Sequence, residues 1–297
     1  MSATLLGIEV TRKCDARTIT INQTAYINEV LRRYGMHDAS PVSTPLAVKE
    51  RLTTAQCATT PEEKKELDEY TNGASYPERV GSLLYATQTR PDIQYVVSVL
   101  AQFSARPGKA HFEGVKRVLR YLKGTANFGL VLGGPGDKID LVGWTDSDWA
   151  QDVVTRRSIG GFVFDIAGGS ISWSSKKQPT VALSSVEAEY MAASNATKEA
   201  IWLRVLLNDL GYKQTTATTI HADNMGCIAL SHNPVSHSRA KHIDIRHHFI
   251  RERVANKEID LCFCSTKDML ADIFTKALPR EAFERFRAAL GVGACSR

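Results

Sequence analysis

The sequence predicts an α/β protein: a mixed sheet with flanking helices, preceded by a mainly helical region that carries a short β-hairpin. Apolar residues alternate in short stretches near the amino terminus and again after residue 137, whereas residues 76–124 repeat them at helical spacing. A Gly/Pro-rich break at 133–136 separates these two patterns. After the break, three successive strands, a helix and a further strand indicate a hairpin sheet that is extended by parallel strands.

The composition is that of an ordinary globular protein. The 297 residues are 43% hydrophobic and 23% charged, which is enough to build the cores of two domains. A net charge of +5 permits nucleic-acid binding without requiring it. Six cysteines without a Cys-x-x-Cys pair, no recognisable signal peptide and no apolar run of bilayer length lead us to expect a non-secreted protein of the cytoplasm or nucleus with no membrane partner.

The elements expected in the amino-terminal part are, in order, strands at 5–11 and 18–22, a helix ended by Gly35, a charged helix at 62–70 and helices across 76–124. Basic residues just before and along the last of these helices, at 111–123, recur at intervals of seven, four and three, which places them on one face. These residues are Lys109, Lys116, Arg120 and Lys123. The face is a candidate for binding a phosphate backbone, and the alternative is an ordinary solvated surface.

The elements expected after the break are strands at 140–144, 160–166 and 170–174, a helix at 185–210, a strand at 218–221, helices at 225–231 and 244–256, a strand at 258–264, and helices at 268–278 and around Phe283. Ligands of such a sheet should lie at the carboxyl ends of its strands.

Acidic residues stand where this fold would gather them. Asp146 ends the first strand of the sheet and Asp223 ends the fourth, and adjacent parallel strands would place the two side by side. Glu189 heads the apolar stripe of the long helix, whereas Glu187 lies on another side of the helical wheel. Asp272 lies among apolar residues of a helix whose start at 265–268 is typical of a capping box.

Four converging carboxylates indicate a site for divalent metal ions. Two ions can activate a water molecule and stabilise the leaving oxygen in phosphodiester hydrolysis, and Mg²⁺ prefers oxygen ligands. Without metal the carboxylates would repel one another, so their pKa values should be coupled and partly raised. The alternative is that these are ordinary surface acids among the 32 acidic residues of the chain, and their spacing alone does not exclude it.

Several segments together resemble the ribonuclease H region of copia-type LTR retrotransposon Pol polyproteins. They are residues 143–150 (GWTDSDWA), 171–178 (ISWSSKKQ), 184–190 (SSVEAEY), 241–251 (KHIDIRHHFIR) and 271–276 (ADIFTK), together with 85–87 (YAT), 89–93 (TRPDI) and 120–125 (RYLKGT) upstream. The resemblance covers nearly the whole chain in order. It implies a ribonuclease H-like sheet in which Asp146, Glu189, Asp223 and Asp272 are both the metal ligands and the catalytic residues.

The resemblance also implies a domain order. The expected parts are a remnant of the reverse transcriptase palm with its primer-grip-like hairpin at 1–50, a thumb-like or connection region at 51–132, a ribonuclease H-like domain at 137–280, and a terminal helix and tail at 281–297. No Asp-Asp pair occurs in the chain, so the Tyr-x-Asp-Asp motif of the family's polymerase is missing and we expect no polymerase activity. Residues 264–269 lack the His that many cellular members carry before the last Asp, so turnover should be slow.

The expected function is therefore cleavage of the RNA strand of RNA/DNA hybrids with Mg²⁺ or Mn²⁺, with two ions and with the rest of a retrotransposon polyprotein as a possible partner. One alternative is a nucleic-acid-binding remnant without catalysis. A weaker one is an integrase or transposase core, in which Glu258, 35 positions after Asp223, would be the last carboxylate. Glu258 opens an apolar alternation typical of a strand, whereas that family places its last Glu on a helix.

Overall fold

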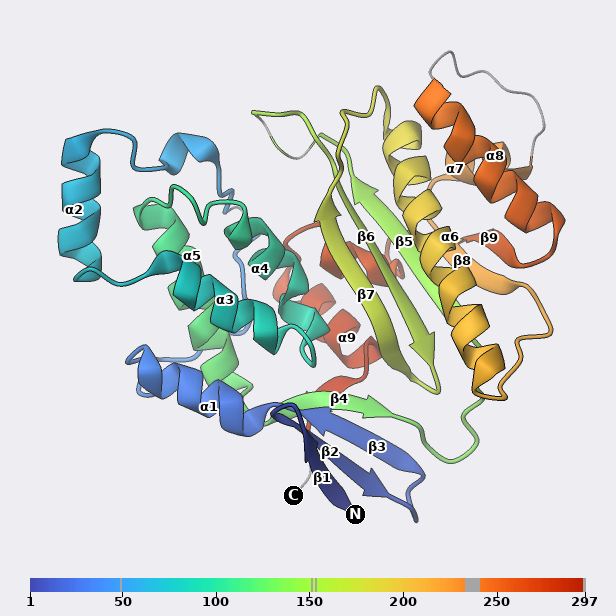
Figure 1. The fold of residues 1–297 in the computed structure, drawn as a ribbon, viewed down its shortest axis with the longest axis horizontal. Helices are drawn as coiled ribbons and strands as arrows, with labels where there is room; N and C mark the ends of the chain where they lie inside the picture. Colours follow the sequence, from blue (N-terminus) through green and yellow to red (C-terminus); the bar gives the residue numbers. More distant parts are fainter. Residues whose placement is uncertain (49, 151, 153, 233–240, 296–297) are drawn as a thin grey trace. The chain divides into compact units, whose positions relative to one another are not determined.

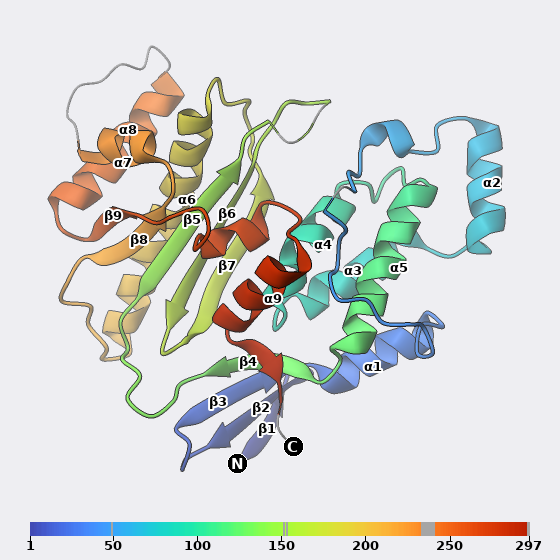
Figure 2. The same ribbon diagram turned by 180° about the vertical axis from the view of Figure 1, so that it is seen from behind.

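The computed structural model describes residues 1–48, 50–150, 152, 154–232 and 241–295 and divides the chain into two compact units (Figures 1 and 2). The first unit joins Met1–Leu132 to the terminal segment Ala277–Arg297, and the second unit is Gly133–Lys276. The terminal segment includes residues 281–297, for which the sequence predicted a terminal helix and tail.

A five-stranded antiparallel sheet, in the order β1-β2-β3-β4-β10, lies in the first unit. Its strands are β1 (Ser2–Leu5), β2 (Ile8–Lys13), β3 (Thr18–Asn22), β4 (Phe128–Leu132) and β10 (Val292–Ala294). The expected hairpin is β2–β3. The sequence did not predict the other strands, which include β10, whose Val292 pairs with Leu130 of β4.

The helices of the first unit pack apolar faces against one another, except α2, which buries no residue. They are α1 (Thr24–Arg33), α2 (Pro61–Thr71), α3 (Tyr76–Ala86), α4 (Gln94–Ala101), α5 (Lys109–Gly124) and α9 (Arg280–Ala289), with short 3-10 turns η1 (Thr54–Gln56) and η2 (Pro91–Ile93). Pro61 occupies the first turn of α2, where its missing N–H costs nothing, and the Thr60 side chain caps that helix. The stripe of α5 is buried through Val115, Val118 and Leu119.

A fully buried ion pair lies inside the first unit. The Arg90 guanidinium donates from Nε and Nη2 to the two oxygens of Asp92, at 2.9 and 2.7 Å, and also reaches Thr125. Tyr121 of α5 donates its hydroxyl to Asp92, and Arg287 of α9 donates to that hydroxyl at 3.2 Å. The network ties η2, α5 and α9 together, and the two buried charges compensate each other.

The second unit is built on a mixed sheet in the order β7-β6-β5-β8-β9. Its strands are β5 (Val142–Asp148), β6 (Ile159–Ile166), β7 (Gly169–Lys177), β8 (Thr218–Ala222) and β9 (Ile259–Phe263). The first three form an antiparallel meander, and β8 and β9 are added in parallel to β5. This is the α/β architecture that the sequence predicted.

Helices complete the second unit: α6 (Ser185–Asp209), α7 (Met225–His232), α8 (Lys241–Ala255) and the 3-10 turn η3 (Leu270–Phe274). The α6 stripe of Ala193, Ala196 and Ala200 is buried, and these small side chains let the helix approach β5 and β6 closely. Gly160 faces Ala192 of α6 whereas Gly161 faces Phe274, so α6 and η3 cover opposite faces of β6. Within the described ranges, no helix is both long and apolar enough to cross a bilayer.

Candidate metal centre

Asp146 lies inside strand β5, not at its end as the sequence suggested. The strand continues to Asp148 because β6 pairs with it over its whole length, and Asp146 lies opposite Gly161. The Asp146 side chain is only 3% exposed. It accepts a hydrogen bond from the hydroxyl of Thr275, which lies directly after η3.

Asp223 follows the last residue of β8, the parallel neighbour of β5. Thr266 donates its hydroxyl to Oδ2 of Asp223 at 3.0 Å. Glu258, the carboxylate on which an integrase-type site would depend, lies at the other end of this strand pair, because its carbonyl accepts from the N–H of Thr218. Its side chain pairs with Arg253 at 3.0 Å, so Glu258 and Asp223 lie at opposite ends of β8 and β9.

Glu189 enters the site from the first turns of α6. Ser184 caps this helix by accepting from the N–H of Glu187, and the Glu187 carboxylate accepts from the N–H of Leu183, so Glu187 serves the helix start. Glu189 is 6% exposed, and the backbone N–H of Ser147 acts to lower the pKa of its carboxyl group. Its Oε2 is buried and has no hydrogen-bond partner among the described residues.

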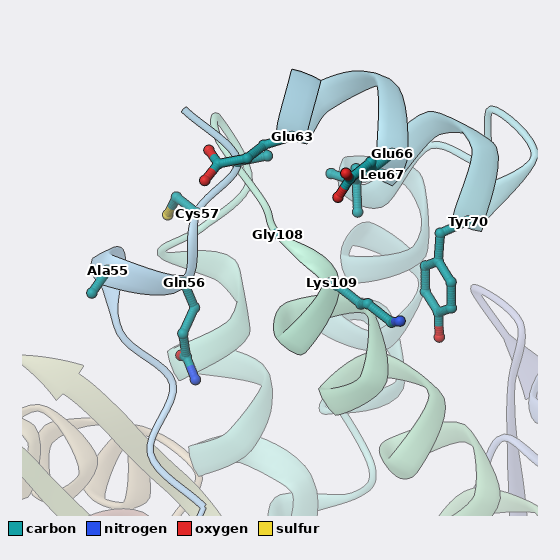
Figure 3. A pocket seen from close by; sticks show the side chains of 10 residues that line it. Ala55, Gln56, Cys57, Glu63, Glu66, Leu67, Tyr70, Gly108 and Lys109 are labelled. Atoms are coloured by element: carbon teal, nitrogen blue, oxygen red, sulfur yellow. The ribbon is translucent and has the colours of Figure 1, made fainter. Parts of the chain in front are cut away.

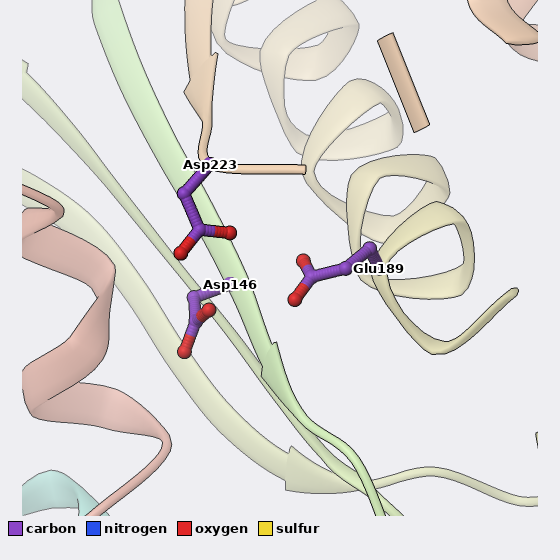
Figure 4. A group of neighbouring side chains, drawn as sticks. All are labelled: Asp146, Glu189 and Asp223. Carbon is purple, nitrogen blue, oxygen red and sulfur yellow. The ribbon is translucent and has the colours of Figure 1, made fainter. Parts of the chain in front are cut away.

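The three side chains converge. One carboxylate oxygen from each of Asp146, Glu189 and Asp223 lies within 4.8 Å of the others, and Figure 4 shows the three carboxyl groups directed toward one another. No other group of three acidic, His or Cys side chains in the described part of the chain meets this criterion. The sheet and α6 thus assemble one compact acidic cluster.

Asp272 approaches this cluster from η3. The helix expected at 268–278 is wrong, because only the 3-10 turn Leu270–Phe274 forms. The expected capping box is wrong too: Ser265 donates its hydroxyl to the Asp268 carboxylate, and the turn has no side-chain cap. Asp272 is 4% exposed, and its carboxylate interacts electrostatically with Asp146.

Lys276 is a part of the site that the sequence did not reveal. Its Nζ lies 2.9 Å from Oδ1 of Asp272 and 4.0 Å from Oδ2 of Asp146. The segment can come this close because Gly161 of β6 has no side chain: a Cβ there would lie 2.7 Å from Cβ of Phe274. The spacing of Asp272 and Lys276 at i and i+4 was the available signal, but it reads equally as an ordinary surface pair.

Crowding and burial raise the proton affinity of the acids. Burial, followed by repulsion from Asp146 and Asp223, raises the pKa of Glu189 to about 10. Burial and the charge of Asp146 raise the pKa of Asp272 to about 7, although Lys276 opposes the rise. The pKa of Asp146 is also raised, chiefly by burial, with Lys276 and Thr275 acting against the shift. Such a cluster holds protons or a cation at neutral pH.

The donor set fits a hard divalent ion. All ligand atoms are carboxylate oxygens, which Mg²⁺ and Mn²⁺ prefer, and they come from strand β5, the residue after β8 and helix α6. The buried, unpartnered Oε2 of Glu189 supports this fit, because an unsatisfied buried carboxylate oxygen costs free energy unless a proton or a cation meets it.

The basic residues predicted on α5 lie in the first unit and are partly engaged there. Nζ of Lys109 and Lys116 lie 4.6 and 4.4 Å from the ring centre of Tyr70, and Lys116 also donates to the Tyr70 hydroxyl at 2.7 Å. Arg120 donates to the carbonyl of Ser40, and Lys123 is exposed. A pocket of 350 Å³ beside Tyr70 is lined by both acidic and basic side chains (Figure 3).

The sheet order, its flanking helices and the acidic cluster define a ribonuclease H-like α/β domain. No protein-family model matches the chain. It is 43% identical over 289 residues to the retrovirus-related Pol polyprotein from transposon TNT 1-94 of Nicotiana tabacum, which covers 97% of this chain and 21% of that protein. It is 40% identical over 287 residues to the Pol polyprotein from transposon RE1 of Arabidopsis thaliana, with 97% and 19% covered.

The chain belongs to the family of copia-type, retrovirus-related Pol polyproteins of transposons. It spans about a fifth of the length of these relatives. Among solved structures it is similar to LC11-RNase H1 in complex with an RNA/DNA hybrid, with a TM-score of 0.35 and 13% identity over 49% of this chain and 98% of that one.

Proposed function

We propose that the second unit is a ribonuclease H that hydrolyses the RNA strand of RNA/DNA hybrids, with Asp146, Glu189, Asp223 and Asp272 holding two Mg²⁺ or Mn²⁺ ions. The observation that carries the proposal is the buried acidic cluster, in which three carboxylates converge within 4.8 Å and Lys276 joins Asp272 to Asp146. The membership of the chain in the copia-type family supports the assignment.

Bound divalent ions would supply an activated water and stabilise the leaving oxygen of the phosphodiester. The residues of the chain prepare the site. Asp146 accepts a hydrogen bond from Thr275, groups with Glu189 and Asp223 and interacts electrostatically with Asp272, so it would hold the ions together with the other three carboxylates. Lys276 neutralises part of the acidic charge until cations replace it.

The proposed substrate is an RNA/DNA hybrid. Its closely spaced phosphates suit cationic side chains, of which Lys109, Lys116, Arg120 and Lys123 are the candidates in the first unit. Minor-groove shape and contacts with 2′-hydroxyl groups would select the RNA strand. The absence of an Asp-Asp pair from the sequence leads us to propose no polymerase activity for this chain. The proposed compartments are the cytoplasm and the nucleus.

The test is metal-dependent cleavage of a hybrid labelled on its RNA strand, with single-stranded RNA, duplex RNA and duplex DNA as controls. Cleavage of the hybrid alone, only with Mg²⁺ or Mn²⁺, would support the proposal. Binding of the hybrid without cleavage at any metal concentration would instead indicate a non-catalytic nucleic-acid-binding protein. Cleavage of duplex DNA in preference to the hybrid would indicate a different nuclease.

A further inference from the structure

Gln178 lies directly after β7 and is buried, with 3% of its surface exposed. Its side-chain amide donates two hydrogen bonds from Nε2, to the carbonyl of Ala188 at 2.9 Å and to Oγ of Ser147 at 3.2 Å. Its own backbone N–H donates to the carbonyl of Ser158 at 2.8 Å, which fixes the residue against the start of β6. Gln178 is therefore held on one side and reaches two different elements on the other.

Both of its side-chain partners adjoin candidate metal ligands. Ser147 follows Asp146 on β5, and Ala188 precedes Glu189 on α6. These two bonds connect β5 to α6 through the Gln178 amide, directly beside the two carboxylates.

We propose that Gln178 is a positioning residue that holds Asp146 and Glu189 at the separation that a divalent ion requires; this inference rests on the metal site of the proposed function. An amide suits the task because one flat group donates two hydrogen bonds without carrying charge. A Lys or Arg in the same place would also neutralise the carboxylates and compete with the cation. Gln178 orders the ligands and leaves their charge to the ion.

The first test is the affinity of the full chain for Mn²⁺. It is measured by calorimetry and by the electron paramagnetic resonance signal of free Mn²⁺. Gln178→Met keeps the size of the side chain and removes both donors. The dissociation constant for Mn²⁺ should rise about ten- to a hundredfold, because losing a group that orients metal ligands commonly weakens metal binding by such a factor. Ser147→Ala removes one acceptor without changing Gln178, and should shift the constant in the same direction by less.

Gln214→Met is the matched control. Gln214 also donates two hydrogen bonds, to the carbonyls of Ile139 at 2.9 Å and Tyr212 at 3.1 Å, but it lies at the opposite end of β5, where it accepts from the N–H of Leu141. This substitution should lower thermal stability and leave Mn²⁺ affinity unchanged. If Gln178→Met likewise lowers thermal stability but leaves Mn²⁺ affinity unchanged, the role of Gln178 is only structural and the proposal is wrong.

Hybrid cleavage gives a second readout. The Mg²⁺ concentration for half-maximal rate should rise in Gln178→Met by the same factor as the Mn²⁺ constant, while the rate at saturating metal stays close to that of the wild type. A wild-type chain that binds Mn²⁺ but does not cleave would contradict the proposed function and leave the effect of Gln178 on affinity measurable. A wild-type chain that binds Mn²⁺ no better than Asp146→Asn would overturn the metal site, and the role of Gln178 with it.

Discussion

Nζ of Lys276 lies 2.9 Å from Oδ1 of Asp272, so the last carboxylate of the site carries its own counter-charge four residues further along the chain. The same ammonium lies 4.0 Å from Asp146. Among the described residues, Lys276 is the cation that lies within 4.0 Å of both Asp272 and Asp146. A bound metal ion would take over the compensation of their charge. This arrangement leads to the first prediction.

Lys276→Met should destabilise the metal-free protein and increase its response to Mg²⁺. The side chain is 34% exposed, so losing its ion pairs should cost about 1–2 kcal/mol of unfolding free energy, less than a fully buried pair would. Saturating Mg²⁺ should reduce the difference in unfolding free energy between this variant and the wild type. Urea unfolding with and without Mg²⁺ measures both effects. Lys65→Met, at an exposed pair on α2, is the control and should change neither; a more stable metal-free Lys276→Met protein would contradict the prediction.

Asp146→Asn should abolish hybrid cleavage and leave the fold intact, because the isosteric amide keeps the hydrogen bond with Thr275 but lacks the charge that the ions need. Asp148 is the comparison, since it lies two residues further along β5 on the same face. Asp148→Asn should retain cleavage. The cleavage rates of both variants are measured, and circular dichroism checks that both are folded. Cleavage kept in Asp146→Asn and lost in Asp148→Asn would mean that Asp148 is the ligand.

The metal-free protein should become less stable as pH rises from about 5 to 9. The pKa of Asp272 is raised to about 7 and that of Glu189 to about 10, both above the values near 4 of an unfolded chain. The folded state therefore binds more protons than the unfolded state in this range, so the stabilisation present at acid pH is lost as pH rises through these folded-state values.

Mg²⁺ should reverse this trend, because it replaces the protons. The rise in melting temperature on adding Mg²⁺ should be larger at about pH 8 than at about pH 5.5, and Mg²⁺ binding should release protons. Thermal unfolding across pH, with and without Mg²⁺, is the measurement. Glu189→Gln should show a flatter pH profile without metal. Stability that rises with pH in the metal-free wild type would be inconsistent with the raised pKa values.

The basic residues of α5 should contribute to hybrid binding without affecting the chemical step. Replacing Lys109, Lys116, Arg120 and Lys123 by Ala should weaken binding to hybrids of any base sequence. The slope of log affinity against log salt concentration should also become flatter, by a few units at most, because each phosphate contact releases counterions. A Lys over the Tyr70 ring keeps its charge, so the Lys109/Lys116 double variant should already show part of the effect. Binding against salt is measured; parallel slopes would mean that this face is an ordinary solvated surface.

Asp92→Asn should destabilise the first unit strongly. Arg90 and Asp92 are fully buried, so removing the negative partner leaves an uncompensated cation and should cost about 3–5 kcal/mol. Glu29→Gln is the control, because its pair with Arg33 is exposed and such pairs contribute little. Chemical denaturation of both variants tests the difference; equal stability would show that the network is dispensable.

The long helix and the sheet could be predicted because their signals are local. The α6 stripe extends over many turns, Ser184 caps one end and Gly211 follows the other with a positive φ, so the expected range agrees with the structure to within a residue. The segment around Asp272 was harder, since the spacing of Met269, Leu270 and Ile273 fits an α-helix and a 3-10 turn equally well.

The remaining features depend on contacts between distant residues. Strands β4 and β10 are short and form through pairing with residues far away in the sequence: β4 pairs with β3 and with β10, where Leu130 pairs with Val292. Lys276 and Gln178 look like ordinary polar residues in the sequence. Lys276 lies beside Asp272, and Gln178 bonds to the neighbours of Asp146 and Glu189, only because the folded chain brings these residues together, and no local pattern encodes these contacts.

The return of the chain to the first unit has a consequence for the order of folding during synthesis. Domains generally fold as they leave the ribosome, the earliest first. Here β4 cannot pair with β10, and Tyr121 cannot bond to Arg287, until the whole second unit has been synthesised. The unit that is translated second can therefore finish folding first. A stop codon just after Lys276 would spare the nuclease-like sheet and instead leave the opening 132 residues with an unpaired strand edge and an exposed apolar surface where Phe283 and Phe286 belong.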